Sequence, residues 1–211
     1  MKDWKNVWIL AEVNHGRLSP TAYELLNAGR KLADDLGEKL CAVLLGSGVK
    51  TWAQDLFEHG ADVVYVCDAA PLAQYVDDVY AKTLAAMIAQ YKPNKFLLPA
   101  TNLGRSLSAK TAIFAGTGLT ADATEVVIHK EDGQLHATRP TFGGNLMATI
   151  TCARTRPEMC SLRPMAYAKA ARVSGRTGEV VEFPFDAAKY TSLAQFIRFI
   201  KSQGEGLDLS E

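Results

Sequence analysis

The sequence predicts an α/β protein with a doubly wound, mostly parallel sheet and helices on both faces, followed by antiparallel strands and a C-terminal amphipathic helix. Through residue 116, short apolar runs alternate with amphipathic stretches, an order typical of right-handed crossovers between parallel strands. The apolar runs are nearly continuous, as expected for strands that are buried on both faces. After Gly118 the pattern changes to extended segments separated by turn residues, which indicate antiparallel pairing.

Four successive strand and helix pairs make up the parallel half. The first strand, 7–13, precedes a helix over 19–37 that opens on Ser19 and Pro20 and closes on Gly37, the residue types that favour helix ends. The later pairs repeat this order: strands 39–46, 62–68 and 95–101, each followed by one of the helices 49–60, 75–92 and 105–116.

The second half is predicted to contain extended segments and one helix. Asp132 and Gly133 form a turn signal between "EVVIHK" and "QLHATRP", so we expect a hairpin there. The segments "NLMATITCA", "EMCSLRPMAYA" and "TGEVVEFPF" are interpreted as further extended pieces. Ser192 caps a predicted amphipathic helix over 192–204. Its apolar face carries Leu193, Phe196, Ile197 and Ile200. We expect one domain over 1–186, then a helix and linker over 187–211.

Composition and charge exclude several classes of function. The chain is 48% hydrophobic and 22% charged, enough to bury a sizeable core, and its 23 basic and 23 acidic residues cancel. That balance argues against a general nucleic-acid binder. The N-terminal run "VWILA" is too short for a signal peptide or a membrane span, so we expect a cytoplasmic protein without membrane insertion. Its cysteines form no C-x-x-C pair and are interpreted as free thiols: Cys41, Cys67, Cys152 and Cys160.

Three regions at the carboxyl ends of the predicted strands are candidate ligand sites, because open parallel sheets bind ligands there. They are two loops, "EVNHGRLSP" and "LLPATNLGRSLSAK", and a third region made of 116–125, 139–150 and 161–165. The loop "EVNHGRLSP" lacks a G-x-G-x-x-G fingerprint, and we interpret His15 as an exposed turn residue. The loop "LLPATNLGRSLSAK" places Thr101, Asn102, Gly104 and Arg105 at a helix N-terminus. These residues could hold a phosphate or carboxylate, or they could simply cap the crossover.

Two arginines in the second half are candidates for contacts with a partner. Arg139 and Arg163 each precede a proline, which favours an extended backbone at the end of an element. They could clamp a partner carboxylate, or they could form internal ion pairs with Asp122 or Glu125.

No arrangement of residues predicts catalysis or metal binding. The sequence contains no catalytic triad pattern, zinc-ligand spacing or paired catalytic carboxylates. His129 and His136 flank the hairpin turn and are interpreted as surface positions. We therefore predict no catalytic residue and no metal ligand.

Several segments, in order and across nearly the whole chain, resemble the N-terminal domain of the electron transfer flavoprotein alpha subunit. They are "LPATNLGRSLSAKTAIFAGTGLTADAT", "TRPTFGGNLMATI" and "RTRPEMCSLRP". The family shows G-R-D-L-A-P-R, T-G-L-x-A-D, R-P-x-F-G-G-N and R-P-x-M-x-T-V-R-P. The element "GRSLSAKTA" departs from this pattern near Ser106 and Lys110, losing an Asp and an Arg, which would weaken a charged contact made there in relatives.

The resemblance implies an electron-carrier subunit, not a catalyst. Such a subunit pairs with a beta subunit and passes electrons from a dehydrogenase, such as an acyl-CoA dehydrogenase, or from NADH in bifurcating systems. FAD binds mostly to a C-terminal domain, whose S-G-G-R-G, Q-T-G and G-I-S-G segments are absent here. The final "GEGLDLSE" resembles the approach to that domain. A second FAD or an AMP would belong to the beta subunit.

The alternative is a stand-alone nucleotide-binding or nucleotidyl-transfer enzyme with the same architecture. That reading requires a glycine-rich phosphate loop after the first strand, where "EVNHGRLSP" supplies a single glycine.

Overall fold

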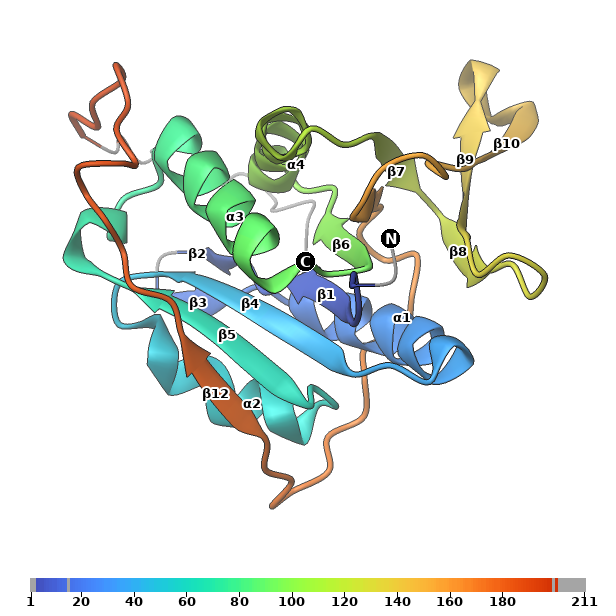
Figure 1. Cartoon of the computed structure of the whole chain (residues 1–211), viewed down its shortest axis with the longest axis horizontal. Helices are drawn as coiled ribbons and strands as arrows, with labels where there is room; N and C mark the ends of the chain where they lie inside the picture. Colours follow the sequence, from blue (N-terminus) through green and yellow to red (C-terminus); the bar gives the residue numbers. More distant parts are fainter. Residues whose placement is uncertain (1–2, 15, 199, 201–211) are drawn as a thin grey trace.

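A seven-stranded parallel sheet forms the centre of the molecule (Figure 1). The computed structural model describes residues 3–14, 16–198 and 200. Every pair of neighbouring strands in the sheet runs parallel. In spatial order the strands are β12 (Glu179–Glu182), β5 (Val63–Asp68), β4 (Leu40–Gly46), β1 (Val7–Leu10), β6 (Lys95–Pro99), β11 (Glu158–Leu162) and β7 (Leu119–Ala123).

Helices cover both faces of this sheet, which confirms the predicted doubly wound class. One face packs against α1 (Thr21–Leu36) and α2 (Ala53–Glu58), and the other against α3 (Asp77–Tyr91) and α4 (Asn102–Ala115) (Figure 1). Short 3₁₀ turns precede α2 and α3: η1 (Val49–Trp52) and η2 (Ala70–Leu72). None of the helices described is long and apolar enough to cross a membrane.

A separate three-stranded antiparallel sheet lies beside the main one. It consists of β8 (Glu125–Ile128), β9 (Leu135–Thr141) and β10 (Leu146–Ile150), with the 3₁₀ turn η3 (Phe142–Gly144) between the last two. The β8–β9 hairpin is the one that the turn signal predicted. Its inner side chains join the core beneath α1, whereas β9 and β10 extend away from the main sheet (Figure 1). A two-residue ladder also pairs β2 (Val13–Asn14) with β3 (Arg17–Leu18).

The pairing of two late strands differs from expectation. The antiparallel strands were expected to follow the parallel half, but β11 and β12 run parallel to their neighbours in the main sheet. All five residues of β11 are buried between β6 and β7, as a central parallel strand requires. The sequence does not reveal this insertion, because the neighbours of β11 in the sheet, β6 and β7, lie far from it along the chain. The strand β7 was also not anticipated.

The predicted helix over 192–204 is wrong where the structure describes it, since residues 192–198 and 200 are not helical. An amphipathic helix gains most of its stability by packing its apolar face against a tertiary partner. Here Leu193, Ile197 and Ile200 are exposed and no described element covers them. Residue 199 and the end of the segment, together with the predicted linker and "GEGLDLSE", lie outside the described residues.

Candidate functional site

A cavity opens at the carboxyl ends of the central strands, where the strand order reverses around β1. Parallel sheets commonly bind ligands at such a position. The cavity has a volume of about 460 Å³, and Phe196 of the C-terminal segment contributes to its wall. Its polar wall residues include Glu12, Asn14, Ser47 and Tyr75. His15, the residue singled out in this loop, lies outside the described residues.

Glu12 supplies a buried carboxyl group to the cavity wall. It is 4% exposed, and its oxygens accept hydrogen bonds from Thr101 Oγ1 at 2.6 Å and Asn14 Nδ2 at 2.5 Å. Among the described residues no lysine or arginine pairs with it. A wall of acceptor oxygens disfavours a phosphate group, whose own oxygens are acceptors. The sequence analysis did not identify Glu12, because a glutamate directly after an apolar run is typical of an ordinary strand end.

The loop around Thr101, proposed to hold an anion, donates hydrogen bonds to other groups of the same chain. Thr101 caps α4 by accepting a hydrogen bond from the Gly104 amide at 3.0 Å, while its own hydroxyl donates to Glu12. Arg105 donates to the carbonyl of Ala100 at 2.9 Å. Gly104 packs so closely that an added Cβ would lie 2.0 Å from the Pro99 carbonyl oxygen. Asn102 is exposed on the first turn. The loop therefore has few donors free for a ligand.

Asp122, at the end of β7, binds two arginines that the sequence places far apart. Arg163 forms a two-point contact, with Nη2 2.7 Å from Oδ2 and Nε 3.2 Å from Oδ1, and Arg105 Nη2 lies 3.0 Å from Oδ1. The hydrogen bond from Arg163 is the main cause that lowers the pKa of Asp122 below its ordinary value. Arg163 thus lies in an internal ion pair, with its side chain still 44% exposed.

Arg139 lies in β9 close enough to Asp122 for its charge to lower the pKa of that carboxyl further. Its Nε is buried and has no hydrogen-bond partner among the described residues. Buried polar atoms normally have a partner. Arg105 and Arg163 therefore pair with the Asp122 carboxylate, and Arg139 acts on it through its charge. We name these four residues the arginine cluster; its net charge is positive.

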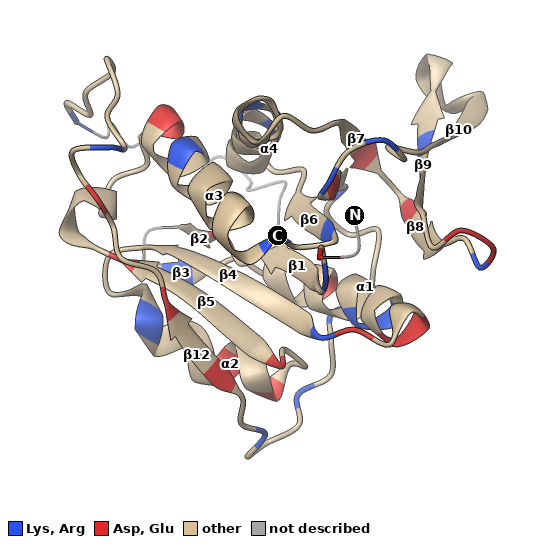
Figure 2. Cartoon of the chain, in the orientation of Figure 1, with Lys and Arg blue, Asp and Glu red and all other residues tan. Residues whose placement is uncertain are grey.

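The arginine cluster lies at the base of an apolar projection that we call the arm, defined as residues 137–150 of β9, η3 and β10. Phe142 is 80% exposed, Leu146 58% and Met147 59%. Arg139 is the one charged residue in the arm, and the rest of it is uncoloured in Figure 2. Leu146 and Met147 are successive residues of β10 and therefore point to opposite faces, so the arm exposes apolar side chains on both of its faces, as interaction surfaces commonly do.

A buried ion pair holds the hairpin that carries the arm. Lys95 Nζ lies 2.8 Å from Glu158 Oε1 and donates to the Gly133 carbonyl at 2.9 Å, while Glu158 Oε2 accepts from the Leu135 amide at 2.5 Å. Both side chains are at most 1% exposed, and burial lowers the pKa of Lys95. Sequence reasoning missed the pair, because charges at the starts of two apolar runs look like exposed strand ends.

Comparisons with known proteins agree with the resemblance seen in the motifs. Residues 7–188 match the electron transfer flavoprotein domain. The chain is 41% identical over its full length to the electron transfer flavoprotein subunit alpha of Thermoanaerobacterium thermosaccharolyticum, and 41% identical over 99% of its length to the protein FixB of Clostridium saccharobutylicum. It is also 40% identical, over 81% of its length, to the acryloyl-CoA reductase electron transfer subunit beta of Anaerotignum propionicum.

The chain spans 64%, 62% and 52% of the lengths of these three relatives, so each of them extends beyond the part compared. The family match covers most of the chain, and the order of motifs agrees with it. The parallel sheet with helices on both faces provides the fold. The chain therefore belongs to the electron transfer flavoprotein family, and it is similar over its whole length to the alpha subunits of that family.

Proposed function

We propose that this chain is the scaffold domain of an electron transfer flavoprotein alpha subunit, and that its arm docks onto a beta subunit. The main observation behind the proposal is the exposed apolar arm, which has the arginine cluster at its base. The complete protein carries electrons from a dehydrogenase, such as an acyl-CoA dehydrogenase, or from NADH if it bifurcates, to an acceptor. It works in the cytoplasm and does not itself catalyse a reaction.

The arm supports docking through burial of apolar surface. Phe142, Leu146 and Met147 lose contact with water in the complex, and fully burying one such side chain contributes about 1.5–3 kcal/mol. Relatives named as subunits support the same role, because a subunit needs a partner surface.

The arginine cluster supports an acidic counterpart on the beta subunit. Arg139 has a buried Nε without a described partner, and Arg163 keeps part of its guanidinium exposed beside Asp122. A carboxylate from the partner would complete the hydrogen bonds of Arg139. Charge-assisted hydrogen bonds of this kind are about twice as strong as neutral ones.

FAD is proposed for the complete protein, held mostly by a domain beyond 187–211, with a second FAD or an AMP in the beta subunit. The residues described here fit the pyrophosphate of a dinucleotide poorly. Thr101, Gly104 and Arg105 of the loop already donate hydrogen bonds within the chain, and Glu12 presents acceptor oxygens to the cavity. We therefore assign no flavin contact to Thr101, Asn102, Gly104 or Arg105.

The cavity favours a second candidate function, a stand-alone nucleotide-binding enzyme, since its position at the switch in strand order is one where nucleotides bind. The acceptor oxygens of Glu12 weigh against that candidate. A colour test separates the two functions. The complete protein, co-expressed with its beta subunit, should purify as a yellow complex with an oxidised-flavin spectrum. A colourless complex with all domains intact would contradict the electron-carrier proposal.

The docking surface is tested by Met147→Asp in the complete protein, with Val173→Asp as the matched control. Both residues are exposed to the same extent, 59%, but Val173 lies beside α2, away from the arm. We expect Met147→Asp to weaken co-purification with the beta subunit at least about tenfold, because it places a charge in an apolar interface. Val173→Asp should have no effect. Equal recovery of the beta subunit with both variants would refute docking through the arm.

A further inference from the structure

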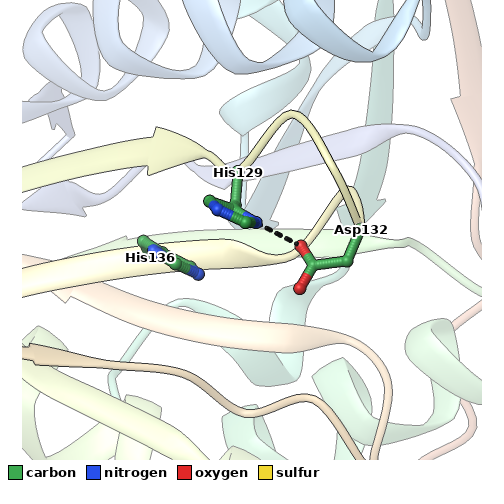
Figure 3. A group of neighbouring side chains, drawn as sticks. All are labelled: His129, Asp132 and His136. Carbon is green, nitrogen blue, oxygen red and sulfur yellow. Dashed lines mark hydrogen bonds and ion pairs between the residues drawn. The ribbon is translucent and has the colours of Figure 1, made fainter.

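The β8–β9 hairpin brings together three side chains whose chemistry the electron-carrier role does not use. His129 follows β8, Asp132 lies in the turn, and His136 lies in β9 (Figure 3). One ligand atom from each residue lies within 4.8 Å of the other two. We propose that these residues form a binding site for a divalent transition metal, with Zn²⁺ as its occupant.

The hairpin register places both imidazoles on the same side. Val127 pairs with His136 across the two strands, and His129 lies two residues beyond Val127, so their side chains share the outer face. The alternate residues Ile128 and Leu135 point into the core. The two imidazole rings are stacked, with centroids 4.6 Å apart and planes 5° from parallel.

One pair of ligand atoms in the cluster already has the spacing of a tetrahedral zinc site. A Zn–N distance of about 2.0–2.1 Å places neighbouring ligand atoms about 3.3 Å apart. His129 Nδ1 is 3.1 Å from Asp132 Oδ1, so this pair already has that spacing. The stacked rings must rotate toward each other for His136 to reach the same ion. The side chains of His129 and Asp132 are 40% and 41% exposed and that of His136 is partly exposed, so none of the three is enclosed by the core.

The backbone beneath the cluster is held in place by the buried ion pair. Lys95 Nζ donates to the Gly133 carbonyl, and Glu158 accepts from the Leu135 amide, so both ends of the turn are tied to the main sheet. The Gln134 amide also donates to Asp132 Oδ1 at 3.0 Å. A turn anchored at these points presents its side chains in a defined geometry, which a metal site requires.

The donor set selects the class of metal. Two imidazoles and one carboxylate suit Zn²⁺ and neighbouring transition metals, whereas Mg²⁺ and Ca²⁺ prefer sites made of oxygen atoms. Three protein ligands at a partly exposed site leave one position for water. The bound ion would link the ends of β8 and β9 and stabilise the hairpin that carries the arm.

The test is calorimetric titration of the full chain with Zn²⁺, using Asp132→Asn, His136→Gln and the control Glu131→Gln. Glu131 is exposed in the same turn and lies outside the cluster, so its variant removes the same charge as Asp132→Asn. We expect one Zn²⁺ per wild-type chain, binding weakened at least about tenfold in both ligand variants, and no change in the control. Zn²⁺ should also raise the midpoint of thermal unfolding in the wild type and the control alone.

Two outcomes would overturn the proposal. One is the absence of saturable binding in the wild type. The other is equal binding by all four proteins, which would place the ion elsewhere, for instance at the partly exposed Cys152. Thermal unfolding without metal shows whether each variant folds, so a loss of binding through misfolding is separated from the loss of a ligand.

Discussion

Replacing Lys95 by methionine should destabilise the chain strongly. The substitution keeps the apolar stem but removes an ammonium group that lies 2.8 Å from Glu158 and 2.9 Å from the Gly133 carbonyl. Removing one partner of a buried ion pair costs about 3–5 kcal/mol, because the other charge stays buried. Arg156 Nη1 remains 2.9 Å from Glu158 Oε1 and compensates in part. We therefore expect a loss near the lower limit, about 3 kcal/mol of the free energy of unfolding.

Urea unfolding of five proteins tests this reasoning: the wild type, Lys95→Met, Glu158→Gln, the double variant with both substitutions, and the exposed control Lys39→Met. The double variant should lose less than the sum of the two single losses, since the first substitution already breaks the pair, and glutamine can still accept from the Leu135 amide. The control should lie within about 0.5 kcal/mol of the wild type. Additive losses in the double variant, or a loss below about 1 kcal/mol in Lys95→Met, would refute the argument.

Two further predictions concern strand β6, which carries Lys95 at its start and Pro99 at its end. Glu158→Gln removes the carboxylate that counters burial of Lys95, so the Lys95 pKa falls further below that of an unfolded lysine. The native state then binds fewer protons than the unfolded one. The free energy of unfolding should therefore rise more steeply with pH than in the wild type, in the range between the lowered pKa of Lys95 and that of an unfolded lysine; parallel pH profiles would contradict this. Gly104→Ala should cost about 3 kcal/mol in urea unfolding, because its Cβ meets the Pro99 carbonyl oxygen, whereas Asn102→Ala in the same turn should cost little. Equal stability of these two variants would show that the backbone yields.

Local patterns predicted most helices and strands of the parallel half. The helix predicted over 19–37 corresponds to α1, and Gly37 ends it as predicted, but the cap at Ser19 is wrong: Pro20 precedes the first residue and no side chain caps the helix. The same reasoning gave a wrong helix at 192–204. The amphipathic pattern is present there, but no described element covers Leu193 and Ile197. A pattern identifies a face that can pack, but the partner for that face comes from elsewhere in the chain.

The candidate site residues divide in the same way. The proline after each arginine predicted an extended backbone at the end of an element. Arg163 follows the end of β11 as predicted, but Arg139 lies inside β9, and the choice between a partner and an internal ion pair was open in the sequence. The fold brings Arg163 to Asp122, 41 residues away, and leaves the buried Nε of Arg139 without a described partner. Such choices depend on which distant segments meet, and local spacing carries no information about that.

The sequence by itself determined the α/β class, the family and the β8–β9 turn, because these depend on local periodicity, turn chemistry and ordered motifs. Only the tertiary structure decided that β11 lies between β6 and β7, and that Lys95 meets Glu158 63 residues later. It also decided that His129, Asp132 and His136 converge, because strand pairing turns separate positions along the chain into neighbours on one face. These contacts arise from burial and pairing between segments, and both depend on the whole chain.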